Sequence, residues 1–175
     1  MSDTLAFPNP AIEDPQIFQT HQELNGLEVD WFREAQANAW KRYQELPVPV
    51  RTNEKWRFAN LNRIRELHKL QPVFTEPENT AALVERSHRF KNVSGRIILA
   101  DDFQVAPVEL DPELEKKGVI FTTLVDAIVK HPDLVREYFM QQTPDLGSEK
   151  FEALHVALLR NGVFLYIPDN IEVEA

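Results

Sequence analysis

The chain has 175 residues, of which 43% are hydrophobic, and its formal net charge is −9 at pH 7. This length and composition fit an ordinary globular domain with a core, and they exclude disorder throughout. The negative charge disfavours a general nucleic-acid binder, and the lack of cysteine excludes disulfides and thiolate chemistry within these residues.

The first 28 residues contain Pro8, Pro10 and Pro15 and show no sustained hydrophobic period. This pattern predicts a flexible leader over residues 1–28. The leader lacks the basic and apolar regions of a signal peptide, and no run in the chain approaches the roughly 18 to 20 apolar residues of a membrane span. These features favour a cytoplasmic protein.

The next segment has the pattern of an amphipathic helix. Its predicted apolar side consists of Trp31, Phe32, Ala35, Ala39, Trp40 and Tyr43. We expect this helix to end at Leu46, because Pro47 and Pro49 lack amide donors and push the residues before them into extended conformations.

The stretch LPVPVRTNEKWRFANL, residues 46–61, follows that helix. Thr52 or Asn53 is suited to cap a short helical turn that contains Trp56. The stretch lies within a basic island, residues 41–69, which holds eight basic and three acidic residues. Such an island either binds an acidic partner or pairs with acidic parts of the same chain, and we favour the internal pairing.

Helix and strand alternate over the middle of the chain. A helix is predicted from near Pro77 toward Arg89. The β-branched run after Gly95 predicts a strand, and the adjacent Asp101 and Asp102 predict a turn.

Residues 118–139 combine one strand with two helices. A short buried strand is predicted at 118–122, and Thr123 is placed to cap a helix with Asp126 at the capping-box position. Apolar residues recur at helical spacing on both sides of His131–Pro132, so we expect two short helices to meet there.

A last helix is predicted to begin after a cap at Ser148. Its predicted apolar face consists of Phe151, Leu154, His155, Leu158 and Leu159. We expect Asn161–Gly162 to end this helix by adopting a left-handed conformation.

The segment GVFLYIPDNIEVEA, from Gly162, alternates as a strand with a turn at Pro168–Asn170. Its first part is apolar on both faces, and such a strand needs neighbours on both sides and at its edges. Either an earlier strand pairs with it, or the chain has been cut from a longer protein.

No residue pattern predicts catalytic or metal chemistry. The five histidines lie at least 20 residues apart and the five glycines never cluster, so we expect neither a metal site nor a nucleotide-binding loop. We interpret His155 as a core histidine with a hydrogen-bond partner. A small hydrolase that uses Asp101, Asp102 or His155 is a minor alternative, because a turn explains the acidic pair better.

Three segments together resemble the SufB/SufD family. Residues 46–61 contain the pattern Leu-Pro-x-Pro-x-Arg-x-x-Glu-x-Trp-Arg-aromatic, which resembles the N-terminal signature of SufD. The segments GVIFTTLVDAIVKHPDLVREYF and KFEALHVALLRNGVFLYIPDNIEVE are similar to later SufB and SufD segments in the same order. The resemblance covers residues 30–174, and the Pro-x-Pro-x-Arg form favours SufD over SufB.

The resemblance implies an α+β fold. A small mixed N-terminal domain of several helices with short strands would end in the first rung of a right-handed parallel β-helix. The implied divisions are the leader at 1–28, a SufD-like domain at 29–161, and the first strands of a truncated β-helix core at 162–175.

The resemblance further implies a non-catalytic scaffold subunit of the SUF iron–sulphur cluster assembly machine, with SufB-like and SufC-like partners. The family's cluster ligands lie outside the matched segments, so no catalytic, cofactor-binding or metal residue and no cofactor is expected here. His155 departs from the asparagine often found at its position. The alternative is a stand-alone binding module that pairs with a partner, or with itself, through its C-terminal strand or through the basic residues 41–69.

Within the signature, the predicted structural anchor consists of Arg51, Glu54, Trp56 and Arg57. We expect Trp56, with Phe58 and Leu61, to pack onto the helix that carries Trp31 and Trp40. The arginines and the glutamate would fix the direction of the segment by hydrogen bonds, because an arginine fork binds a carboxylate in two places. The alternative is a surface linker whose charges have no structural role.

Overall fold

The computed structural model describes residues 15–24, 27–61, 75–142 and 148–174. Contacts divide the chain into two units, each built from two separate stretches of sequence. Unit 1 comprises Met1–Phe74 with Met140–Leu159, and unit 2 comprises Thr75–Phe139 with Arg160–Ala175. The domain boundaries predicted after residues 28 and 161 stay a prediction.

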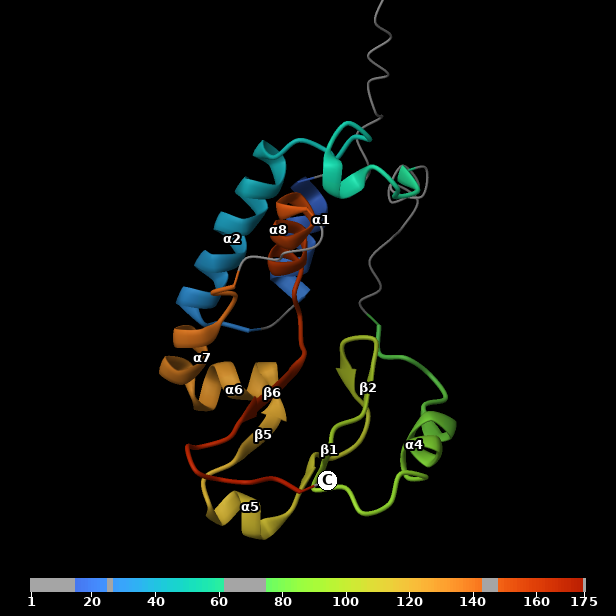
Figure 1. Cartoon of the computed structure of the whole chain (residues 1–175), viewed down its shortest axis with the longest axis vertical. Helices are drawn as coiled ribbons and strands as arrows, with labels where there is room; N and C mark the ends of the chain where they lie inside the picture. Colours follow the sequence, from blue (N-terminus) through green and yellow to red (C-terminus); the bar gives the residue numbers. More distant parts are fainter. Residues whose placement is uncertain (1–14, 25–26, 62–74, 143–147, 175) are drawn as a thin grey trace, which may run out of the picture. The chain divides into compact units, whose positions relative to one another are not determined.

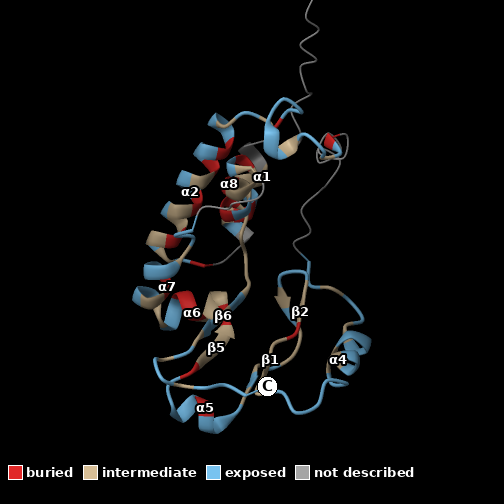
Figure 2. Cartoon of the chain, viewed as in Figure 1, coloured by how far each residue is buried: buried red, intermediate tan, exposed pale blue. Residues whose placement is uncertain are grey.

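Within the described residues of unit 1, α1 (Pro15–Leu24), α2 (Asp30–Glu45) and α8 (Glu149–Ala157) lie side by side in Figure 1. The buried cluster between α2 and α8 consists of Trp40, Tyr43, Ala153 and Ala157. Figure 2 shows buried residues along the facing sides of these two helices. The alanines leave room for the large rings of α2, so the two helices approach closely.

The structure confirms the helix predicted after residue 28 and its end at Leu46. Leu46 follows the helix in an extended conformation, with φ −78° and ψ 138°. The predicted apolar side is largely correct, since Phe32, Trp40 and Tyr43 are buried, but Gln36 is buried beside them.

Helix α1 corrects part of the predicted flexible leader. Phe18 stacks on Trp40 of α2 with ring centroids 5.1 Å apart, and His21 is only 2% exposed. Gln22 Nε2 donates a hydrogen bond to Gln36 Oε1 at 3.0 Å. These contacts hold residues 15–24 as a helix against α2, and residues 1–14 lie outside the described part.

Polar side chains join α2 and α8 at both ends. Lys150 of α8 is 4% exposed, and its Nζ donates to the carbonyl oxygens of Tyr43 and Leu46 at 2.8 Å each. Gln36 of α2 is fully buried, and its Nε2 donates to the Leu159 carbonyl oxygen at 2.8 Å. Each helix therefore supplies donors for carbonyl groups near the C-terminal end of the other, where intrahelical partners are lacking.

Unit 2 begins with α4 (Ala81–Ser87), which starts later than the helix predicted from Pro77. Two small antiparallel sheets follow, β1 (Gly95–Arg96) with β4 (Glu109–Leu110) and β2 (Leu99–Ala100) with β3 (Phe103–Gln104). The predicted acidic turn joins β2 to β3, and Asp101 has a left-handed φ of 52° there. Aspartate tolerates this conformation better than most residues, which suits it to the turn.

After α5 (Pro112–Lys116), β5 (Ile120–Thr123) pairs antiparallel with β6 (Val163–Tyr166). Phe121 lies opposite Leu165 in this register. The final strand therefore has an earlier strand as its neighbour, which was the first of the two predicted alternatives.

Helices α6 (Leu124–Lys130) and α7 (Pro132–Tyr138) meet at His131 as predicted. The predicted cap is also confirmed, because the Thr123 hydroxyl accepts a hydrogen bond from the Asp126 amide at 3.2 Å. The cap satisfies an amide that has no partner within the first turn of the helix.

The predicted cap of α8 at Ser148 is confirmed, its predicted apolar face is only partly correct, and the predicted burial of His155 is wrong. The buried residues of α8 are Lys150, Ala153, Val156 and Ala157, and His155 is exposed. The large rings of α2 pack against the small side chains Ala153 and Ala157 of α8, while Leu154 and Leu158 of the predicted face are partly buried at the edge of the same cluster.

Neither Asn161 nor Gly162 has a positive φ, so they do not end α8 by the predicted left-handed turn. The Asn161 side-chain oxygen instead accepts from the amides of Gly162 and Val125, at 2.9 and 3.4 Å. Asn161 thereby stabilises the approach to β6 and the start of α6. No helix in the described ranges has the length and apolar character that crossing a bilayer requires.

Candidate functional site

The segment that carries the family signature leaves α2 in a fixed direction. The Leu46 amide makes the last hydrogen bond of α2, to the Arg42 carbonyl oxygen at 3.0 Å. The Lys150 ammonium group sits beside this end, bonded to two carbonyls and 4.2 Å from the centroid of the Tyr43 ring. A cation at a helix C-terminus is favoured by the helix dipole, so Lys150 stabilises both the helix end and the chain that follows.

Asn53 organises the turn that follows the prolines. Its side-chain oxygen accepts from the Val50 amide at 2.9 Å, and its own amide donates to the Val50 carbonyl oxygen at 2.9 Å. The 3-10 turn η2 (Glu54–Trp56) begins immediately after it. Asn53 occupies the predicted cap position, but its side chain makes no capping bond to the turn, because it bonds backward to Val50.

A cavity of about 480 Å³ lies between this segment and the first turn of α8. Its walls are Leu46, Pro47, Val48, Pro49, Asn53, Glu54, Lys55, Trp56, Ser148, Glu149 and Lys150. The proline half of the wall is apolar, and charged side chains stand on the other half. The cavity wall therefore combines apolar and charged side chains from two separate parts of unit 1.

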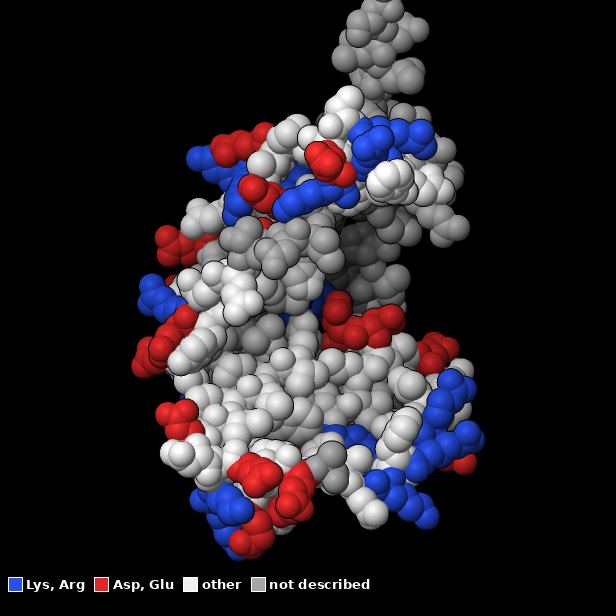
Figure 3. All heavy atoms as spheres, in the orientation of Figure 1, with Lys and Arg blue, Asp and Glu red and all other residues white. Residues whose placement is uncertain are grey.

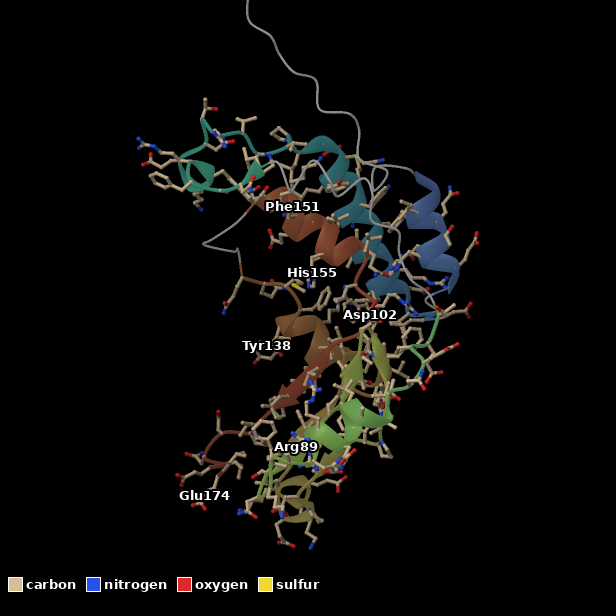
Figure 4. The ribbon with its side chains drawn as sticks, turned by 90° about the vertical axis from the view of Figure 1, so that its right-hand side faces the viewer. Arg89, Asp102, Tyr138, Phe151, His155 and Glu174 are labelled. Atoms are coloured by element: carbon tan, nitrogen blue, oxygen red, sulfur yellow. The ribbon has the colours of Figure 1, made fainter. Side chains whose placement is uncertain are left out.

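Trp56 points inward. Its ring is half-buried and packs against Phe151 of α8, with centroids 5.9 Å apart and an interplanar angle of 58°. Phe151 is labelled at the start of α8 in Figure 4. The predicted anchoring of Trp56 thus involves α8, a partner that spacing along the sequence did not indicate.

Of the other two predicted apolar anchors, Leu61 is buried and Phe58 is exposed. Leu61 is buried, with 6% of its surface exposed, as expected. Phe58 is 93% exposed, so its predicted packing onto the helix is wrong. Because Trp56 occupies the inward side of the short turn, Phe58 two positions later lies on the outward side.

Arg51, Lys55, Arg57 and Phe58 all point into solvent, and we call them the outward face of the signature. The Arg57 guanidinium carbon lies 5.4 Å from the centre of the Phe58 ring, within cation–π range. Lys and Arg side chains gather over this part of the molecule in Figure 3. Glu54 is exposed as well, and the anchor role of Arg51, Glu54, Trp56 and Arg57 stays a prediction.

The predicted internal pairing of the basic island is confirmed for Arg42. Its Nη2 lies 2.9 Å from Glu149 Oε2 at the start of α8, although both side chains are about half exposed. Residues 62–69 of the island lie outside the described residues. The structure thus divides the island into an arginine that pairs internally and an outward face.

The other candidate residues do not form a reactive site. Asp101 and Asp102 are exposed in a hairpin turn, and Asn161 Nδ2 donates to the Asp102 carbonyl oxygen at 3.1 Å. His155 is exposed on α8, which corrects its interpretation as a core histidine, whereas His21 is buried against Gln36. Within the described parts of the chain, no group of three or more ligand-type side chains is placed to hold a metal ion.

Unit 2 presents an apolar surface along β6. Val163 and Leu165 are 53% and 55% exposed, and Ile167 is exposed just beyond the strand. Tyr138 at the end of α7 is exposed too, and the neighbouring Glu137, which hydrogen-bonds its hydroxyl, raises the pKa of Tyr138. This tyrosine stays neutral at physiological pH, so it adds no charge to unit 2.

Comparison with known proteins identifies relatives. The family described as the SufBD protein N-terminal region matches residues 91–175. The iron–sulphur cluster assembly protein SufD of Bacillus subtilis is 31% identical over 151 residues, which cover 84% of this chain and 34% of SufD. A SufBD family protein of Mycobacterium tuberculosis is 26% identical and covers 84% of this chain and 18% of that relative.

A chloroplastic SufBD family protein of Arabidopsis thaliana is 25% identical, across 82% of this chain and 28% of the relative. The chain therefore spans about a third or less of the length of these proteins. No solved structure matches it. The family resemblance noted in the sequence is confirmed: the chain belongs to the SufB/SufD family and corresponds to the N-terminal region of its members.

Proposed function

We propose that this chain is the non-catalytic N-terminal domain of a SufD-like scaffold in iron–sulphur cluster assembly. SufB-like and SufC-like subunits are its proposed partners, in the cytoplasm, and cluster ligands would come from parts of the complex outside this segment. The observation that carries the proposal is the 31% identity to a SufD protein across 84% of the chain.

The exposed apolar side chains of β6 support a scaffold role. β6 is paired along one side with β5, while Val163 and Leu165 face outward. A further strand laid over this face would remove apolar side chains from water, which is the main driving force for such packing. We propose that β6 is the first rung of a right-handed parallel β-helix.

The proposed function is tested in the organism that carries the gene. Deleting the gene should lower the activity of a cluster-dependent enzyme severalfold under iron limitation, and the intact gene should restore it. An enzyme without a cluster serves as the control. Unchanged activity of the cluster enzyme in the deletion strain would contradict the proposal.

The partners are tested separately by co-expressing the tagged protein with SufB-like and SufC-like subunits of the same organism. We expect all three to co-purify in one peak after size exclusion. Recovery of the tagged protein alone would reject the proposed complex without rejecting a role in cluster assembly.

The second candidate is a stand-alone module that self-associates by strand addition, and the exposed apolar side chains of β6 favour it. It predicts concentration-dependent dimers in size exclusion with light scattering. Leu165→Lys should abolish them, because a charge on an apolar sheet face opposes its burial. A monomer at all concentrations argues against this candidate.

A further inference from the structure

The outward face of the signature combines a large apolar side chain with several cations, all exposed to solvent. Phe58 is 93% exposed, the highest exposure among the large apolar residues that the structure describes as exposed. Three cationic side chains, Arg51, Lys55 and Arg57, precede it in sequence and are exposed as well. Scattered single apolar residues are normal on protein surfaces, but this phenylalanine lies within cation–π range of Arg57, and both aromatic residues and arginine are enriched in protein interfaces.

The turn that carries this face is already ordered. Backbone hydrogen bonds join the Trp56 amide to the Asn53 carbonyl, the Arg57 amide to Glu54, and the Ala59 amide to Trp56, at 2.9 to 3.2 Å. The Trp56 ring holds the other side of the turn against α8. A partner would therefore bind without first ordering the backbone, and such preorganisation lowers the entropic cost of binding.

We propose that the outward face is a docking surface for an acidic protein that presents an apolar pocket beside its carboxylates. Phe58 would enter the pocket, while Arg51, Lys55 and Arg57 would pair with the carboxylates around it. Arginine suits this role because its guanidinium group can stack on the Phe58 ring and bind a carboxylate at the same time.

Charge distinguishes a protein partner from a nucleic acid. The chain carries a net charge of −9, so a long polyanion would be repelled by most of the molecule. The attraction of the outward face is local, because salt screens exposed charges beyond about 8 Å at physiological ionic strength. A protein whose acidic residues are confined to one patch can bind the outward face through that patch, while the rest of its surface stays outside the range of repulsion by the acidic parts of this chain.

The proposal is tested on the intact chain with a defined probe, a synthetic amphipathic helix of glutamate and leucine labelled with fluorescein. Anisotropy gives its affinity, and NMR shifts of backbone amides locate it. We expect shifts confined to residues 51–58 and weaker binding at higher salt. Phe58→Ala and the combined Arg51→Glu, Lys55→Glu and Arg57→Glu variant should each weaken binding about tenfold or more.

A matched control is present in the same chain. Phe90 is 73% exposed between Arg89 and Lys91, so it has a similar neighbourhood in sequence. We expect Phe90→Ala to change the affinity less than about twofold, because general attraction between bases and acids does not depend on one ring. All variants change exposed side chains, and unchanged melting temperatures would verify that they fold.

Several results would overturn the docking surface. These are no binding by the unaltered chain, equal loss in the Phe90→Ala variant, or unchanged binding in either outward-face variant. Stronger binding of single-stranded DNA to residues 51–58 would assign the face to nucleic acid instead. None of these measurements uses the Suf subunits. A negative result would therefore reject the docking surface without rejecting the proposed role in cluster assembly.

Discussion

Lys150 illustrates how a charged side chain can be accommodated in a small core. Its methylene groups lie within the interface between α2 and α8, and its ammonium group meets two carbonyl oxygens and the face of the Tyr43 ring. A buried charge without such partners is strongly destabilising. The Lys150 ammonium group avoids this cost and also supplies hydrogen-bond donors to carbonyl groups at the end of α2, which have no partners within the helix.

Replacing this lysine should therefore destabilise unit 1. Lys150→Met keeps most of the aliphatic volume but leaves the Tyr43 and Leu46 carbonyls without their donor. We expect a loss of about 1 to 3 kcal/mol in the free energy of unfolding, measured by urea titration. Lys116→Met is the control, because Lys116 is exposed and pairs with Glu113 on the surface, and it should change stability by less than about 0.5 kcal/mol. Equal effects of the two substitutions would refute the structural role of Lys150.

The two aromatic residues of the signature provide a second residue-scale test. Trp56→Ala removes a half-buried ring that packs on Phe151, and we expect a loss of about 1 to 3 kcal/mol. This is less than the 3 to 5 kcal/mol expected of a fully buried ring. Phe58→Ala should leave stability unchanged within about 0.5 kcal/mol, because the ring is exposed. Thermal unfolding of both variants distinguishes the inward from the outward side of the turn.

At the scale of elements, the close approach of β1 to β5 depends on a glycine. A Cβ added at Gly95 would lie 2.7 and 2.8 Å from carbons of the Phe121 ring and 3.2 Å from the Glu109 carbonyl oxygen. Gly95→Ala should therefore cost about 1 to 3 kcal/mol in denaturant unfolding, since the ring or the strand must move.

Gly162→Ala is a suitable control for that substitution. A Cβ at Gly162 would meet the Leu124 side chain at 3.7 Å, an ordinary contact distance, so stability should change by less than about 1 kcal/mol. Adding Phe121→Leu to the Gly95→Ala variant should recover part of the loss. No recovery would place the strain at the Glu109 carbonyl instead of the ring.

The elements with local signals were the ones that the sequence predicted well. Prolines marked the end of α2, Thr123 and Ser148 marked helix starts, and His131–Pro132 marked a boundary between helices. Such signals act within a few residues, so they can be recognised without knowledge of the fold. The family signature was recognisable for the same reason.

The interhelical contacts could not be predicted in this way. Gln36 bonds to Leu159, and Lys150 bonds to Tyr43 and Leu46, across more than 100 residues of sequence. A polar residue at helical spacing is normally assigned to the exposed side, so both were overlooked. The repeat of Lys150, Ala153 and Ala157 along one side of α8 was the available signal, but its meaning depends on large rings in a distant helix.

At the scale of the whole molecule, both units depend on two separate stretches of the chain. α8 completes unit 1, although most of the sequence between α2 and α8 belongs to unit 2. A fragment of residues 75–175 should therefore retain β5, β6 and α6 but lose hydrogen-exchange protection in α8, since α2 would be missing. Comparison with the intact chain by NMR tests this, and protected α8 amides in the fragment would contradict it.

The late position of α8 has a consequence for biosynthesis. A ribosome adds about 5–20 residues per second, so the roughly one hundred residues between α2 and α8 take on the order of ten seconds to emerge. For the later part of that interval Trp40 and Tyr43 lie outside the ribosome, while α8, which packs against them in the folded chain, has not been translated. α1 can already stack Phe18 on Trp40 during this time, but the side of α2 that packs on α8 stays uncovered, and this period is when a chaperone would have most reason to bind the nascent chain.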